Sequence, residues 1–302
     1  MNNLLFGVSL LVLLNACEPL PENDRQTKIS HELSQEFKDY WYSGYAELNH
    51  YSLEQARYGE IHKGDAVLIF VTEDFLTDKQ VKYELGEREN VQSVLKLNFT
   101  RKFNTGIYPY SLMSSIFTPV NLNQPTLKVT TSSQEWCGHT FSQLNFTENS
   151  YQGHLFSYFQ KEGDTQVSVK STILEDAVWN IIRISPDKLP TGEITMIPGT
   201  QFLRFRHRET QSEKALTTLE QAGDSTTLMK YKIEYQDFVR VLEITFEKKF
   251  PHTIIKWEET TESGFGTPET LTTRAFRTHS INSPYWSQNS LADSVYRKEL
   301  GF

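Results

Sequence analysis

The chain has 302 residues, a formal net charge of −8 and 13% aromatic side chains. An acidic chain of this kind is a poor candidate for binding nucleic acid, and its two cysteines cannot build a disulfide framework. The length suits one large domain or two small ones.

Residues 1–16 have the pattern of a bacterial lipoprotein signal peptide. The apolar run 4–14 spans about 11 residues, whereas a membrane-spanning helix needs about 20, so the run fits the apolar core of a secretory signal. Leu14-Asn15-Ala16-Cys17 resembles a lipobox, which predicts cleavage before Cys17 and fatty acylation of that residue. Three acyl chains form a permanent anchor. The alternative is an ordinary signal peptide whose cysteine is incidental.

Residues 17–30 predict the lipidated cysteine and a short flexible tether, because they are polar, contain two prolines and lack periodicity. Some bacterial lipoproteins reach the cell surface through an acidic cluster after the cysteine. Pro19 and Leu20 interrupt such a cluster here. We therefore expect an anchor in the outer membrane, with the remaining chain facing the periplasm.

Residues 31–302 are predicted to form a single β-rich domain that begins with a short helix. Leu33, Phe37 and Tyr40 lie on one helical face, which predicts a helix over 31–40 with Ser30 as its N-cap. The apolar run 66–71 predicts a buried strand after a turn at 63–65. Further strands are predicted over 91–99, 126–131, 153–159 and 166–171.

A central helix interrupts this series of strands. Leu174, Val178, Ile181 and Ile182 follow helical spacing, which predicts a helix over 174–183 that Pro186 ends. Strands are then predicted over 192–197, 201–209, 226–235, 238–247 and 254–261, with a last helix over 290–299.

The predicted fold is mainly β (α+β), with two β-rich halves, about 31–172 and 190–280, joined by the central helix. Short strands without alternating helices favour antiparallel pairing. We therefore expect one large curved antiparallel sheet that wraps the central helix.

The segment 132–140 is the most enzyme-like, because it holds a thiol, an imidazole and a carboxylate. On a strand, Cys137 and His139 would point the same way about 7 Å apart, which is too far for a hydrogen bond unless Gly138 forms a bulge. A buried cysteine beside a core tryptophan is the simpler interpretation. The alternatives are a ligand contact and a reactive thiol that uses His139 or His154. The scattered histidines predict no metal site, and no cofactor motif is present.

Two groups of cations are candidate ligand contacts. A strand over 201–209 would place Arg204, Arg206 and Arg208 on one face, which suits an anionic ligand. The alternative is a solvated face that pairs with Glu243 and Glu247. Lys96, Tyr108 and Tyr110 contribute to a second, cation-and-aromatic rim that could bind sugar or lipid headgroups, or else form an ordinary packed turn.

Several segments together resemble a group of envelope lipoproteins from Bacteroidota. These are the lipobox, Tyr40-Trp41-Tyr42, LEQARYGE (53–60), FNTGIYPY (103–110) and SQEWCG (133–138). The resemblance covers nearly the whole mature chain and implies no established activity. Some members carry the label "septum formation inhibitor Maf", but this chain lacks the Ser-Pro-Arg-Arg-type motif of the Maf nucleotide pyrophosphatases. The layout is also similar to that of carriers which ferry lipoproteins between membranes, an analogy that does not set function.

These observations predict a non-enzymatic envelope lipoprotein, held at the membrane through Cys17. Its sheet would bind an amphipathic, lipid-like or glycan ligand or another envelope protein. One alternative is a cysteine-dependent enzyme that uses Cys137. Another is a scaffold with no small ligand.

Overall fold

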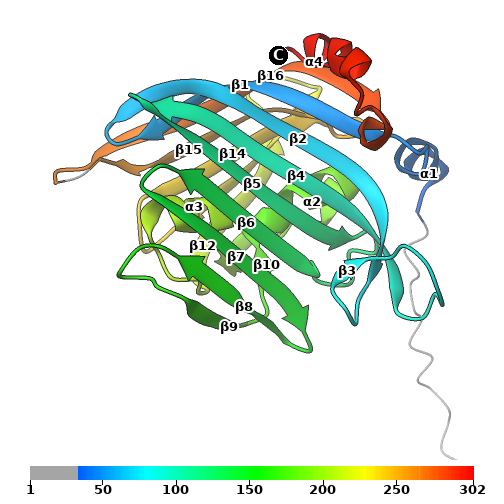
Figure 1. The fold of residues 1–302 in the computed structure, drawn as a ribbon, viewed down its shortest axis with the longest axis horizontal. Coiled ribbons are helices and arrows are strands. Elements are labelled where there is room, and N and C mark those ends of the chain that lie inside the picture. The colour runs from blue at the N-terminus through cyan, green and yellow to red at the C-terminus, as the bar shows by residue number, and fades with distance from the viewer. Residues whose placement is uncertain (1–32, 265) are drawn as a thin grey trace, which may run out of the picture. The chain divides into compact units, whose positions relative to one another are not determined.

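The computed structural model describes residues 33–264 and 266–302 (Figure 1). The predicted signal peptide, the lipidation site Cys17 and the tether lie outside the described residues. Among the described residues, no helix has the length and apolar character needed to cross a bilayer.

The described chain is mainly β, which confirms the predicted fold class. The first half contains β1 (Ala46–Arg57), β2 (Glu60–Leu76), β3 (Val81–Lys82), β4 (Val91–Thr105), β5 (Tyr108–Pro119), β6 (Lys128–Glu135), β7 (Gly138–Thr147), β8 (Ser150–Ser157) and β9 (Thr165–Lys170). The second contains β10 (Ile173–Leu174), β11 (Gly192–Ile197), β12 (Glu213–Gln221), β13 (Leu228–Tyr235), β14 (Arg240–Glu247), β15 (Ile254–Ser263) and β16 (Glu269–Ser283). The helices are α1 (Gln35–Trp41), α2 (Glu175–Ile184), α3 (Thr200–Arg206) and α4 (Val295–Glu299), with 3₁₀ turns at Pro186–Lys188, Tyr285–Ser287 and Leu291–Ser294.

All of these strands belong to one sheet. Its order runs from β10 to β16, then through β1 and β2 to β9, and β3 pairs with β2 outside this path. The pairing of β16 with β1 joins the two halves. Neighbouring strands are antiparallel except β10 and β11, which are parallel.

The sheet curls strongly, because its two edges are consecutive in the chain. β9 ends at Lys170 and β10 begins at Ile173, and three residues of chain span at most about 11 Å. A flat sheet of this many strands would separate its edges by roughly 65 Å, at about 4.8 Å for each strand. The edges therefore come together at this end of the sheet.

Helix α2 fills much of the concave side (Figure 1). All of its residues are buried, and Val178 and Ile182 pack in the main core. The amide of Asn180 donates to the carbonyl of Leu95 and to the hydroxyl of Thr118, each at 3.0 Å. The helix is thus fixed to the sheet by polar contacts as well as by apolar burial.

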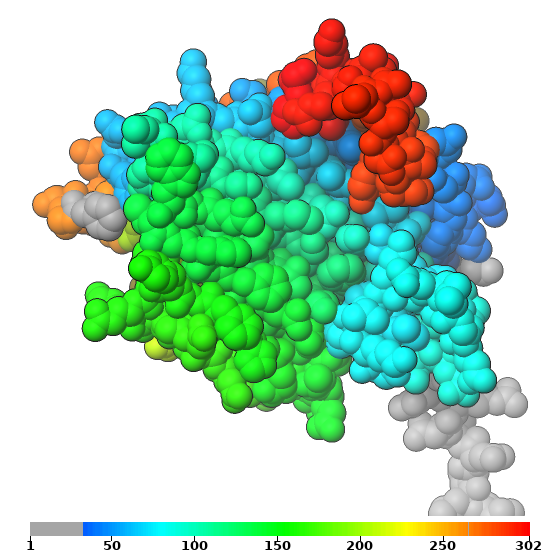
Figure 2. Space-filling view, viewed as in Figure 1, coloured from blue at the N-terminus to red at the C-terminus, as the bar shows by residue number. Residues whose placement is uncertain are grey.

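A smaller core lies under the C-terminal segment, which Figure 2 shows in red over the blue N-terminal strands. Leu300 packs there with Leu48, Val67 and Val71. Parts of β1 and β2 are therefore covered on both faces, which explains why residues 46–51 are all buried.

Three local predictions were wrong. The first helix begins at Gln35 and is capped by Ser34, whose hydroxyl accepts from the Phe37 amide; the predicted cap, Ser30, lies outside the described residues. Residues 63–65 continue β2 instead of forming a turn. Gly64 is needed there because a Cβ would lie 2.2 Å from the carbonyl oxygen of Lys102. The segment 201–209 is largely helix α3 rather than a strand.

Candidate functional site

A cavity of about 720 Å³ lies beside α3, where the tips of several hairpins meet. We call it the α3 cavity. Its walls come from the β1–β2 turn, the β4–β5 and β6–β7 hairpins, α3 and the ends of β15 and β16. Its lining includes Arg57, Tyr58, Tyr108, Cys137, Phe205 and Arg206. Cavities of this size commonly hold small organic ligands.

The β1–β2 turn places Tyr58 against this cavity in an unusual backbone conformation. Tyr58 and Gly59 form a two-residue hairpin loop in which both residues have positive φ, 56° and 81°. Glycine adopts this geometry freely, whereas a bulky residue pays roughly 1–2 kcal/mol for it. Strained residues of this kind cluster at functional sites, so the turn supports a functional role for the tyrosine.

Three tyrosines and one arginine form a connected polar group in the wall. The hydroxyls of Tyr58 and Tyr110 share a hydrogen bond, and Tyr108 donates to Tyr58 at 3.3 Å. The guanidinium of Arg57 lies 4.4 Å from the centre of the Tyr58 ring and 5.0 Å from that of Phe205. Burial raises the pKa of Tyr110, so this phenol stays protonated and can donate.

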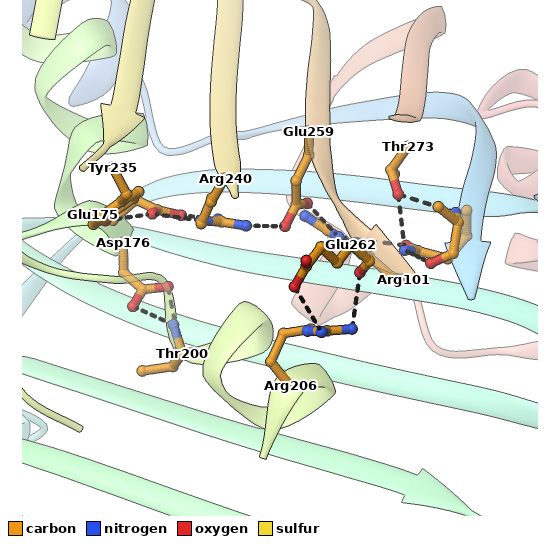
Figure 3. Close-up of polar contacts among 12 residues, drawn as sticks. Arg101, Glu175, Asp176, Thr200, Arg206, Tyr235, Arg240, Glu259, Glu262 and Thr273 are labelled. Atoms are coloured by element: carbon orange, nitrogen blue, oxygen red, sulfur yellow. Dashed lines mark hydrogen bonds and ion pairs between the residues drawn. The ribbon is translucent and has the colours of Figure 1, made fainter. Parts of the chain in front are cut away.

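The deeper wall of the cavity adjoins a buried ionic network (Figure 3). The carboxylate of Glu259 accepts from Arg240 and, at 3.0 Å, from Arg101. Arg240 also donates to Glu175, which accepts a further hydrogen bond of 2.7 Å from Tyr235. Burial opposes ionisation of Glu259, yet the charges of Arg240 and Arg101 outweigh it and lower the pKa to about 2.

Asp176 is a third carboxyl group near this network. Two guanidiniums already balance Glu175 and Glu259, and Asp176 instead accepts from the amide of Thr200 at 2.9 Å. Burial raises the pKa of Asp176 to about 7, and the charge of Glu175 adds to this effect. The network is therefore close to neutral when Asp176 carries a proton.

The three arginines expected on one strand face do not share a face, because they lie on and just after a helix. Arg204 is buried near Glu135, with 3.8 Å between nitrogen and oxygen. Arg206 lines the α3 cavity and lies 3.7 Å from the carboxylate of Glu262 (Figure 3). Arg208 pairs with Glu213 at 3.2 Å. The expected partners Glu243 and Glu247 play no part in these pairs.

The predicted cation-and-aromatic rim is only partly assembled. Tyr108 lines the cavity, and Tyr110 is buried with its ring stacked on Phe103 and its hydroxyl bonded to Tyr58. Lys96 does not belong to this group. It pairs with Glu73 at 3.2 Å on another part of β4.

Cys137 is exposed and lines the cavity, so the interpretation of a buried cysteine beside a core tryptophan is wrong. It lies in the turn between β6 and β7, and its neighbour Trp136 is 70% exposed. His139 is exposed on β7. His154 pairs with Gln143, four residues from His139 or roughly 13 Å along the strand. No hydrogen bond joins the Cys137 thiol to an imidazole within residues 33–264 and 266–302.

Arg57 and Glu259 were not predicted as site residues. A sequence signal exists for Arg57, since Tyr58-Gly59 separates two strands by two residues and thus marks a hairpin. No comparable signal exists for Glu259, because its partner Arg101 is 158 residues away. Comparisons of the chain with protein-family models, with curated proteins and with solved structures found no match in any of the three.

Proposed function

We propose that this chain is a lipid-anchored protein of the bacterial cell envelope, held at the outer membrane through Cys17 and facing the periplasm. Its β domain binds an amphipathic small molecule in the α3 cavity and catalyses no reaction. The lipobox and the resemblance to envelope lipoproteins support the location. A Cys17→Ala variant that fractionates with membranes as the parent does would contradict the anchor.

The α3 cavity is the observation that carries the binding function. Helix α2 and the core side chains fill much of the concave face. A cavity of about 260 Å³ remains against α2, and a larger one of about 720 Å³ remains beside α3. Aromatic rings of Phe159, Phe202 and Phe205 offer apolar surface to an acyl chain or to the face of a sugar ring. Arg57 and the tyrosine hydroxyls offer polar contacts beside them, as an amphipathic ligand requires.

A scaffold without a small ligand is the second candidate, because α2 occupies so much of the concave face. Substitutions at two adjacent threonines distinguish the ligand-binding hypothesis from the scaffold hypothesis. Thr261 lines the cavity, whereas Thr260 bonds Thr272 at 2.8 Å and points to the other face of β15. The measurement is binding of 1-monolauroylglycerol, below its aggregation concentration, to a soluble form that begins at Glu18.

Thr261→Trp should fill the cavity and weaken binding at least about tenfold, whereas Thr260→Trp should leave it within about twofold. Calorimetry gives the affinity. A parent protein that binds no amphiphile would favour the scaffold.

A further inference from the structure

Cations and carboxylates alternate around the α3 cavity, and most of them form pairs. Arg206 lies 3.7 Å from the carboxylate of Glu262. The imidazole of His207 lies 2.7 Å from that of Glu162. Arg204, just behind the wall, lies 3.8 Å from Glu135. Each of these basic side chains therefore has an acidic neighbour. Burial lowers the pKa of His207, and the charge of Arg204 lowers it further, so this imidazole is largely neutral near pH 7.

Arg57 is the exception. Its Nη1 donates to the carbonyl of Phe205 at 2.7 Å, and its Nη2 lies 3.4 Å from the hydroxyl of Tyr110. These acceptors are uncharged, and Nε is buried without a partner. No carboxylate of the described residues forms an ion pair with Arg57. Burial lowers the pKa of Arg206, and the charge of Arg57 lowers it further.

Glu259, a carboxylate that also lines the cavity, does not form an ion pair with Arg57. Glu259 already accepts from both Arg101 and Arg240, and its low pKa keeps it ionised for those two partners. Among the described residues, Arg57 is thus the guanidinium of the cavity wall that has no carboxylate at ion-pair distance, whereas Arg206 has Glu262. A guanidinium with spare donors in a largely aromatic surrounding is well suited to bind a carboxylate or a phosphate.

We infer that the ligand of the α3 cavity carries an acidic headgroup, a carboxylate or a phosphate, which pairs with Arg57. This inference rests on the proposed function and names the ligand class. Tyr108 also lines the cavity, and its single O–H, which donates to Tyr58 in this structure, can turn to the same headgroup oxygens. The acyl or other apolar part then lies against Phe202 and Phe205.

The test uses a matched pair of amphiphiles, 1-monolauroylglycerol and 1-lauroylglycerol 3-phosphate, which differ only by the phosphate. The soluble parent should bind the phosphate form at least about tenfold more tightly at low salt, because charge-assisted hydrogen bonds are the strong ones. Arg57→Met keeps most of the apolar stem and should lose this preference, while it still binds the neutral probe. Arg88→Met is the control, because Arg88 pairs with Asp74 away from the cavity.

The possible outcomes test the cavity function, the acidic headgroup and the role of Arg57 separately. If neither probe binds the parent, the proposed function fails. If both bind equally well, the cavity function stands and the acidic headgroup is refuted. If Arg57→Met keeps the preference for the phosphate form, Arg57 is not the recognition residue and the inference is overturned. If Arg57→Met binds neither probe, Arg57→Lys, which keeps the charge, must keep a preference for the phosphate form, or the inference falls.

Two further probes distinguish the sources of the acidic group. Glycerol 3-phosphate carries the phosphate without the chain, and laurate carries a carboxylate on the same chain. An amphipathic ligand predicts that laurate binds more tightly than glycerol 3-phosphate. The opposite order would show that the site takes a free phosphorylated polyol, and it would refute the amphipathic part of the proposed function while leaving the acidic headgroup in place.

Discussion

Arg183 in α2 meets Glu47 in β1 through two parallel hydrogen bonds of 2.5 and 2.6 Å, across 136 residues of sequence. Tyr40 and Asn49 also donate to this carboxylate. At the other end of α2, Glu175 binds Arg240 of β14. The central helix is therefore clamped at both ends by buried ion pairs that connect it to the two halves of the sheet.

Glu47→Gln should lower the free energy of unfolding by about 3–5 kcal/mol, because it leaves a fully buried guanidinium without its carboxylate. Urea denaturation measures this directly. Glu243, which is partly exposed and pairs with Lys230, is the matched control, and Glu243→Gln should cost less than about 1 kcal/mol. Equal effects of the two substitutions would contradict a structural role for the clamp.

Asp176 should make stability fall as the pH rises from about 4 to about 7. Its folded pKa is about 7, and that of an unfolded aspartate is about 4, so the folded state binds the additional proton between these values. The loss is at most about 4 kcal/mol. Asp176→Asn should abolish this slope, since an asparagine oxygen can still accept from the Thr200 amide. Parallel stability–pH curves for the two proteins would disprove the prediction.

Subtracting the stability–pH curve of Asp176→Asn from that of the parent isolates the effect of Asp176. Glu259 changes stability with pH in the opposite direction. Glu259 has a folded pKa of about 2, below the unfolded value of about 4, so its contribution is present above pH 4 and is lost as the pH falls toward 2. Both proteins contain Glu259. Its effect therefore cancels when the curves are subtracted.

Tyr58→Asn should separate binding from stability. Asparagine accepts positive φ more readily than tyrosine, so the relief of strain offsets part of the lost ring contacts, and stability should stay within about 1 kcal/mol of the parent. Binding of 1-lauroylglycerol 3-phosphate should fall about tenfold, because Arg57 loses the ring over which it lies. Tyr151→Asn, at a fully buried tyrosine, should instead cost at least about 3 kcal/mol. A large loss of stability in Tyr58→Asn would show that the turn is purely structural.

Cys137 should react quickly with a maleimide in the folded protein, because its residue is exposed. Since it also lines the α3 cavity, bound 1-monolauroylglycerol should slow the reaction several-fold. Cys137→Ser should bind the probe within about twofold of the parent, as expected if the thiol is a bystander. Conversion of the probe by the parent but not by Cys137→Ser would revive the enzyme hypothesis.

Much of the sheet could be predicted from local sequence. The strand 192–197 was predicted with the observed bounds, and the central helix within one residue, because each has a clear apolar periodicity. The strands β1, β5, β7, β12 and β16 were not predicted. In β1 the segment ELNHYS shows no simple alternation, because both faces of this part of the strand are covered.

Helix α3 shows why the structure of the candidate site could not be predicted from the sequence. QFLRFRHR alternates apolar and basic residues, which is typical of a strand. The helix is only seven residues long and is fixed by distant groups, since Gln201 donates to the carbonyl of Phe99 at 3.2 Å. Tertiary contacts override local pattern in such short elements. The cavity depends on this helix, so it could not be inferred from spacing alone.

The most direct measurement is native mass spectrometry of the protein purified from its own membranes, followed by extraction and identification of any bound small molecule. If the α3 cavity binds an acidic amphiphile, one equivalent should accompany each chain, and Arg57→Met and Thr261→Trp should lose it while Arg88→Met and Thr260→Trp keep it. A chain that carries no small molecule and takes up neither lauroyl probe would contradict it.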